Sequence, residues 1–144
     1  MNKLKVTMDA KESQQISETI AKNLKDFNES KVGAYDFKPF TISLTDDAEN
    51  FIAGLYGQLF DKVCLIETVW VRENERKKGL GTQLFNKLDE FIKENNCNLI
   101  QLATTEFQGR QFYETIGFSV VAVLPYEFKG YTTYIMRKTF ERLD

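Results

Sequence analysis

The sequence predicts an α/β fold, an α+β sandwich built on a mixed, mostly antiparallel sheet of about seven strands flanked by about three to four helices. Runs of alternating or continuous apolar residues favour strands, and apolar residues at every third or fourth position favour helices. The two kinds of segment follow each other along 144 residues, with no repeat or linker between them. We therefore expect a single domain spanning residues 1–144.

The first third of the chain predicts a strand and a long helix. Residues 3–8, KLKVTM, alternate polar and apolar side chains as a half-buried strand does. Asp9 followed by Glu12 resembles a capping box, and apolar residues then recur at spacings of three and four. Gly33 is a residue type that ends helices, so we expect the helix to stop there.

Three strands are expected next. Residues 40–44 and 51–60 are strand-like runs separated by the turn-forming segment TDDAEN, which indicates a hairpin. Residues 62–71, KVCLIETVWV, are almost continuously apolar and β-branched. This composition is typical of a strand that is covered on both faces.

The remaining chain alternates helices and strands. Residues 71–91, VRENERKKGLGTQLFNKLDEF, pass from a charged run through two glycines into an amphipathic helix that ends near ENNCN. The elements expected after it are a strand at residues 99–105, a short helix in GRQFYETIGF closed by Gly117, and two strands in FSVVAVLPYE and YTTYIMRKTF around the Lys129–Gly130 turn.

Composition excludes several classes of function. The chain has no histidine, so Ser-His and Cys-His nucleophiles are excluded, and Cys64 and Cys97 have no metal-ligand spacing, so no metal is expected. The net charge of -2 and the lack of a long basic run argue against nucleic-acid binding. There is no apolar run of roughly 18 residues and no secretion signal. We therefore expect a cytoplasmic protein that does not bind membranes.

The glycines of RKKGLGTQL, Gly79 and Gly81, lie between an apolar strand and a helix. Glycine lets backbone N–H groups approach a ligand closely, and the free N–H groups of a helix N-terminus attract an anion. The P-loop pattern does not fit this turn, and the dinucleotide fingerprint would need a glycine where Leu84 stands.

The pattern that does fit is Arg/Gln-x-x-Gly-x-Gly/Ala, matched by Arg76, Gly79 and Gly81. FQGRQFYETIGF follows about twenty residues after the block ETVWVRENERKKGLGTQLFNKLDEF, in the same order as in known relatives. On these two blocks the sequence resembles the GNAT superfamily of acyl-CoA-dependent N-acyltransferases, over residues 51–140. The resemblance implies a GNAT-like fold with a splayed central strand pair, and acetyl-CoA as the acyl donor.

The resemblance also implies which residues bind the donor. Backbone groups at Val69 and Val71 would pair with the pantetheine arm as an added strand does. Gln108 follows Phe107, which stands where many relatives have an asparagine, and Gln108 would supply the missing amide contact. The pyrophosphate would rest on the glycine turn and its side chains: Arg76, Lys77, Lys78, Gly79, Leu80, Gly81 and Thr82.

Two residues are candidates for catalysis. Glu67 is a carboxylate in an otherwise apolar run, where partial burial would tune it as the general base; the alternatives are a surface carboxylate, and water as the base. Tyr113, four residues before the Gly117-Phe118 pair, would protonate the departing thiolate; otherwise it is a core tyrosine. A backbone N–H of the Trp70–Val71 segment would stabilise the oxyanion.

The acceptor is expected to be a primary amine of a small molecule or a protein, and the fold allows a homodimer. Acidic residues of the TDDAEN turn would attract a polyamine or an aminoglycoside, or simply form a turn. The rival interpretations are a non-catalytic acyl-CoA-binding module and a structural protein without a ligand. Aromatic residues near the expected acceptor pocket, which fit core packing equally well, are Tyr35, Phe37, Tyr56, Tyr126, Phe128, Tyr131 and Tyr134.

Overall fold

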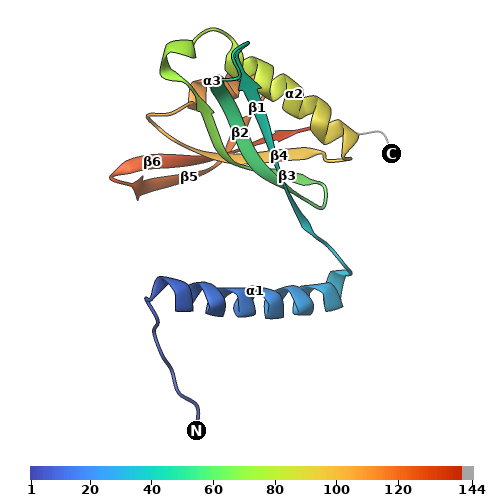
Figure 1. The fold of residues 1–144 in the computed structure, drawn as a ribbon, viewed down its shortest axis with the longest axis vertical. Coiled ribbons are helices and arrows are strands. Elements are labelled where there is room, and N and C mark those ends of the chain that lie inside the picture. The colour runs from blue at the N-terminus through green and yellow to red at the C-terminus, as the bar shows by residue number, and fades with distance from the viewer. Residues whose placement is uncertain (141–144) are drawn as a thin grey trace. The chain divides into compact units, whose positions relative to one another are not determined.

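A computed structural model of the chain describes residues 1–140, which divide into two units between Tyr35 and Asp36 (Figure 1). The first unit contains one helix, α1 (Ala10–Val32). Its N-terminus is capped as predicted, because the Asp9 side chain accepts a 2.9 Å hydrogen bond from the Glu12 backbone N–H. Gly33 ends the helix with a φ of 88°, which favours glycine.

The strand expected at residues 3–8 is absent, because this segment has no strand conformation and no ladder partner. Leu4 and Val6 are fully or almost fully exposed, so the alternating pattern does not mark a buried face here. The large apolar residues of α1 are also exposed, from 43% at Ile16 to 76% at Val32. The first unit therefore has no buried residue within its helix.

The second unit is built on one mixed sheet, in which six strands have the order β1-β2-β3-β4-β6-β5. Adjacent strands pair antiparallel except β3 and β4, which are parallel. This is the α/β architecture that the sequence predicts, with one strand fewer. The strands are β1 (Phe37–Thr45), β2 (Phe51–Phe60), β3 (Val63–Val71), β4 (Leu99–Thr105), β5 (Ser119–Phe128) and β6 (Tyr131–Thr139).

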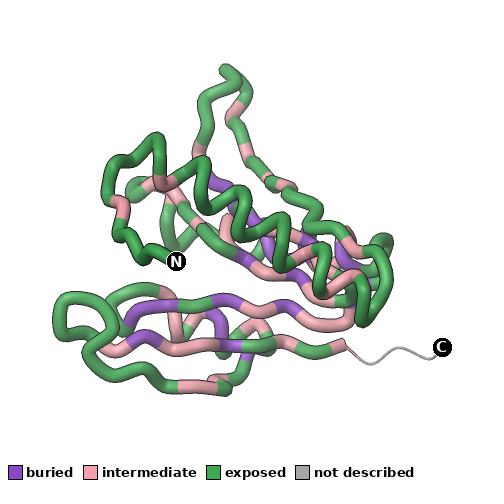
Figure 2. Tube along the Cα trace, turned by 90° about the horizontal axis from the view of Figure 1, so that it is seen from below, coloured by how far each residue is buried: buried purple, intermediate pink, exposed green. Residues whose placement is uncertain are grey.

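Two helices of this unit, α2 (Leu80–Glu94) and α3 (Arg110–Thr115), follow β3 and β4. The apolar residues of α2 recur at helical spacing, so its buried side chains join Leu55, Leu59 and Ile66 in one core. Figure 2 colours the chain trace by how far each residue is buried. The opposite face of the sheet is more exposed, with Trp70 at 44%. The expectation that residues 62–71 are covered on both faces is therefore wrong for the second half of this strand.

The parallel pair β3–β4 separates partway along its length. β3 pairs with β4 at Val63, Cys64 and Leu65 and at no later residue. Glu67 is an extra residue opposite β2, because Gly57 pairs with Ile66 and Tyr56 pairs with Thr68. A bulge of this kind bends a strand and increases its twist. The predicted splay of the central strands is thus present, and it starts beside the bulge.

Candidate functional site

The turn before α2 carries a run of unpaired backbone amides. The first helical bond joins the Gln83 N–H to the Gly79 carbonyl over 3.1 Å. In residues 1–140, the backbone N–H groups from Lys77 to Thr82 donate to no protein acceptor. These amides precede or begin a helix of fifteen residues, whose dipole adds positive potential. The turn can therefore receive an anionic group, such as a diphosphate.

The two positions in this turn, Gly79 and Gly81, require glycine for different structural reasons. Gly79 has a φ of 80°, in the left-handed region, and a Cβ on it would meet open space. A Cβ on Gly81 would lie 2.9 Å from Cζ of Phe112, so Gly81 is small because that ring packs against it. Gly79 allows the backbone conformation of the turn, whereas Gly81 allows Phe112 of α3 to pack closely against α2.

The cationic side chains near the turn are partly committed within the protein. Arg76 Nε donates to the Val71 carbonyl over 2.9 Å, so this guanidinium holds the end of β3. Lys78 Nζ lies 3.3 Å from a carboxylate oxygen of Glu75. Lys77 and Thr82 are exposed. Backbone amides are thus the main donors that the turn presents.

Beyond the bulge, the edge of β3 that faces away from β2 exposes the backbone groups of every second residue. The Arg72 N–H donates to the Ile52 carbonyl of β2 over 2.8 Å. The backbone N–H and C=O groups of successive residues point to opposite sides of a strand. Those of Val69 and Val71 therefore point away from β2, toward the edge of β3 that no longer pairs with β4. Arg76 occupies the Val71 carbonyl. The groups of Val69 and the Val71 N–H remain available to an extended ligand.

Glu67 lies at the bulge and is exposed, so the partial burial expected for it is not found. Gln58 Nε2 donates to Glu67 Oε1 over 3.0 Å, which holds the carboxylate above the strand pair. Its neighbour Thr68 is also exposed, whereas Val69 packs against the core. The bulge therefore places the carboxylate on the sheet face opposite α2, at the start of the splay.

Tyr113 lies on the other side of the sheet, in the core beneath α2 and α3. Its ring makes edge contacts with Phe85, Phe112 and Phe118, with centroids 5.4 to 5.7 Å away. Burial raises the pKa of its phenol to about 12, so the phenol remains a proton donor at neutral pH. Gly109 permits the close approach of this ring, since a Cβ there would lie 3.3 Å from it.

The hydroxyl of Tyr113 is not sealed in the core. Among residues 1–140 this hydroxyl has no hydrogen-bond partner. A fully buried side-chain oxygen without a partner occurs in that range only at Oδ1 of Asp89, so the Tyr113 hydroxyl is not fully buried. The hydroxyl must therefore retain contact with solvent. Tyr113 and Glu67 are not hydrogen-bonded to each other in the described chain, and they lie on opposite faces of the sheet.

Gln108 supports the loop between β4 and α3. Its Oε1 accepts a 2.7 Å hydrogen bond from the Thr105 N–H and a 3.4 Å bond from the Thr104 hydroxyl. The carbonyl end of this amide is thus used within the loop, and its NH₂ group remains as a donor.

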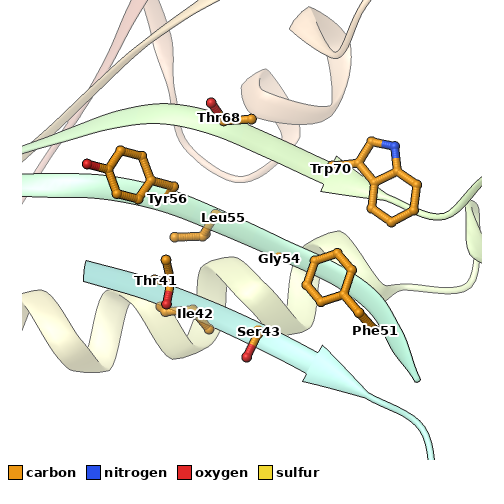
Figure 3. A pocket seen from close by; sticks show the side chains of 9 residues that line it. All are labelled: Thr41, Ile42, Ser43, Phe51, Gly54, Leu55, Tyr56, Thr68 and Trp70. Atoms are coloured by element: carbon orange, nitrogen blue, oxygen red, sulfur yellow. The ribbon is translucent and has the colours of Figure 1, made fainter. Parts of the chain in front are cut away.

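A pocket of about 310 Å³ lies on the face of the sheet opposite α2. The Phe51 and Trp70 rings stack at one end, 5.7 Å apart, and Tyr56 stands at the other (Figure 3). Of the seven aromatics expected near an acceptor, this pocket uses Tyr56. Phe51 and Trp70 were missed. The signal was available, because Trp70 alternates with the core residues Val69 and Val71 and so belongs to the opposite face.

The other expected aromatics lie elsewhere in the described chain. Phe107 contacts Phe128 and Tyr131 near the β5–β6 turn, with centroids 6.2 and 4.9 Å away. Phe37 stacks on Phe60 at 4.6 Å, and the Arg110 guanidinium lies 4.3 Å from the ring centroid of Tyr134. Tyr126 is 82% exposed and Tyr35 accepts a 3.0 Å bond from Asn28.

The acidic turn between β1 and β2 is held by hydrogen bonds among its own residues. Asp46 accepts hydrogen bonds from the backbone N–H groups of Ala48 and Asn50 and from the Asn50 side chain. The bonds from Asn50 lower the Asp46 pKa below its usual value. This turn is therefore a closed local structure.

Two further features are absent from residues 1–140. No cluster of three or more potential metal-ligating side chains occurs in that range. No helix there has both the length and the apolar character needed to cross a membrane.

Comparison with known proteins identifies acetyltransferases as similar proteins. A curated relative, blasticidin-S acetyltransferase from Streptomyces morookaense, is 28% identical over 86 residues, which cover 59% of this chain and 63% of the relative. A solved acetyltransferase from Bacillus cereus is 22% identical, covers 96% of this chain and 98% of its own, and has a TM-score of 0.81. An aminoglycoside 6'-N-acetyltransferase complexed with coenzyme A is 19% identical, with coverages of 74% and 76% and a TM-score of 0.66.

The sequence model of the acetyltransferase (GNAT) family matches residues 10–118, a range that includes the splayed strand, the amide-rich turn and Tyr113. This match spans most of the chain. The protein therefore belongs to the acetyltransferase (GNAT) family.

Proposed function

We propose that this protein is an N-acetyltransferase, which transfers the acetyl group of acetyl-CoA to a primary amine in a ternary complex. The observation that carries the proposal is the run of unpaired backbone amides from Lys77 to Thr82 beside the free edge of β3. An unpaired edge would receive the pantetheine amides, and the amides of the turn would receive the diphosphate. The two features would bind adjacent parts of one elongated ligand.

The chemistry needs a base on one side of the thioester and an acid on the other. A lysine-like amine with a pKa of about 10.4 costs roughly 4.6 kcal/mol to deprotonate at pH 7. In our proposal Glu67 accepts this proton, directly or through water, and the amine nitrogen attacks the carbonyl carbon. As the C–N bond forms, the nitrogen loses its second proton to water. The C–S bond then breaks, the thiolate takes a proton from the Tyr113 phenol, and water returns a proton to the phenolate. The placement of Glu67 and Tyr113 on opposite faces of the sheet suits this order of events.

The family match starts at the first residue of α1 and ends at residue 118, which supports treating α1 and the sheet unit as parts of one acetyltransferase domain. The relatives named above act on blasticidin S and on an aminoglycoside, as their names state. They support a small-molecule amine as the acceptor. Because this chain spans 63% of the curated relative, the acceptor itself is inferred below from this chain's own residues.

Calorimetry with coenzyme A, followed by an amine panel with acetyl-CoA and a thiol readout, tests the proposal. We expect saturable binding and amine-dependent thiol release. As a matched control, Asn86→Asp adds a negative charge to α2 beyond its first turn and should leave binding unchanged, whereas Thr82→Asp places the same charge among the free amides and should weaken it at least about tenfold. Binding without turnover would instead support a non-catalytic acyl-CoA-binding module. No binding would refute the proposal.

A further inference from the structure

The pocket beside Trp70 borders the proposed reaction centre. Thr68 and Trp70 line it from the stretch of β3 that follows the bulge. Their neighbours Val69 and Val71 direct backbone groups to the edge proposed for pantetheine. Glu67 directly precedes this stretch and lies on the same exposed face. A molecule in the pocket would therefore lie next to both the thioester of the proposed acetyl-CoA and the carboxylate of Glu67.

The aromatic residues of the pocket leave ring surface uncovered. Phe51 and Trp70 are nearly parallel, with an interplanar angle of 10°, and are 49% and 44% exposed. Gly54 makes this arrangement possible, because a Cβ there would lie 2.9 Å from the Phe51 ring. Phe51 therefore lies close over the β2 backbone, beside Trp70. A flat ring can stack on such surfaces with little loss of side-chain freedom.

The charge of the pocket limits its ligand. All nine lining residues are uncharged. Besides the aromatic rings, the lining contains the side-chain hydroxyl groups of Thr41, Ser43 and Thr68 (Figure 3). A polycation needs several carboxylates, and the nine residues that line the pocket supply none. Glu67 offers one carboxylate at one side of the pocket. One negative charge beside a neutral aromatic surface matches a ligand with one ammonium group on an apolar, flat body.

We propose that the acceptor is a small arylalkyl monoamine, whose ring stacks in the pocket of Trp70, Phe51 and Tyr56 and whose amine reaches Glu67. The inference rests on the proposed acetyltransferase function. The volume of about 310 Å³ lies at the lower end of small-molecule sites, which favours such an amine over an extended peptide.

Trp70 is the single tryptophan of the chain, so its fluorescence reports this pocket without any need for turnover. We would titrate the full chain with phenethylamine, hexylamine and spermidine. Saturable quenching or shifting of the emission is expected with phenethylamine, at an affinity at least roughly fivefold better than for hexylamine. Phe51→Leu retains Trp70 and should weaken phenethylamine binding several-fold. Phe128→Leu, an exposed aromatic outside the pocket, should not.

Turnover gives a second, separable readout. With acetyl-CoA, kcat/KM should favour phenethylamine over hexylamine, and Trp70→Leu should remove most of this preference while Trp70→Phe retains it. If no amine is acetylated but phenethylamine saturates the fluorescence change, the catalytic proposal fails and the ligand class stands. If spermidine or a short peptide is preferred, or if phenethylamine and hexylamine are equivalent in both assays, the ligand class is wrong.

Discussion

The side-chain amide of Gln58 donates a 3.0 Å hydrogen bond to the carboxylate of Glu67. The two residues belong to neighbouring strands at the bulge, where β3 has just separated from β4. Gln58 therefore orients the one carboxylate that β3 presents on its exposed face. A charge-assisted hydrogen bond of this kind is stronger than a neutral one and restricts the side chain.

Replacing Glu67 by Gln should lower kcat by roughly 10²-fold, because the amide cannot accept the amine proton. The KM for acetyl-CoA should change little, since Glu67 lies outside the turn that carries the free amides. Steady-state thiol release measures both values. Asp61→Asn, which removes an exposed carboxylate from the β2–β3 turn, is the control. Equal rates for wild type and Glu67→Gln would exclude Glu67 as the base.

Replacing Tyr113 by Phe should also lower kcat, by roughly 10-fold to 10²-fold, because the phenol no longer donates to the thiolate. The buried ring is retained, so folding should be preserved. An acyl donor with a more acidic leaving thiol needs less protonation, and the defect of the variant should shrink with such a donor. An undiminished defect would indicate that Tyr113 acts through packing alone.

The same substitution should alter stability at high pH. Burial raises the folded pKa of Tyr113 from 10.0 to about 12, while in the unfolded chain the phenol ionises at its ordinary value. The unfolded state thus loses this proton first, and the contribution of Tyr113 to stability is complete below pH 10 and declines as the pH rises toward 12. Urea unfolding of wild type should lose stability more steeply over this interval than Tyr113→Phe. Parallel curves would contradict the burial of the phenol.

Replacing Gly81 by Ala should destabilise the protein by about 1 to 2 kcal/mol, despite the better helix propensity of alanine. The added Cβ would lie 2.9 Å from the Phe112 ring, which is packed against Phe85 and Tyr113. In a Phe112→Leu background the same change should cost less. Denaturant unfolding of the four proteins completes the double-mutant cycle. Additive effects would show that this contact does not determine the glycine.

Cys64 and Cys97 should not react with a thiol reagent in the folded protein. Both are fully buried, and burial raises the pKa of the Cys64 thiol to about 12. The native protein should therefore release almost no colour with Ellman's reagent, and the chain unfolded in guanidinium should release two equivalents, as its two cysteines require. Rapid reaction of the native protein would contradict the core packing around β3.

Much of the fold and part of the site could be predicted because their signals are local. Asp9 and Glu12 cap α1, and the apolar spacing from Leu84 to Ile92 defines the buried face of α2. The glycine turn before α2 and the order of its neighbours indicated the family, which the family match confirms. The sequence failed at residues 3–8, where alternation resembles a strand but no strand lies alongside to pair with it.

By itself, then, the sequence determined most of the helices and strands and the position of the glycine turn before α2, because these depend on residues close together along the chain. Only the tertiary structure decided that Glu67 is an exposed bulge residue held by Gln58, that Tyr113 approaches from the core, and that Phe51 and Trp70 form a pocket. These relationships depend on strand register, and register brings together residues whose separation in sequence carries no local signal.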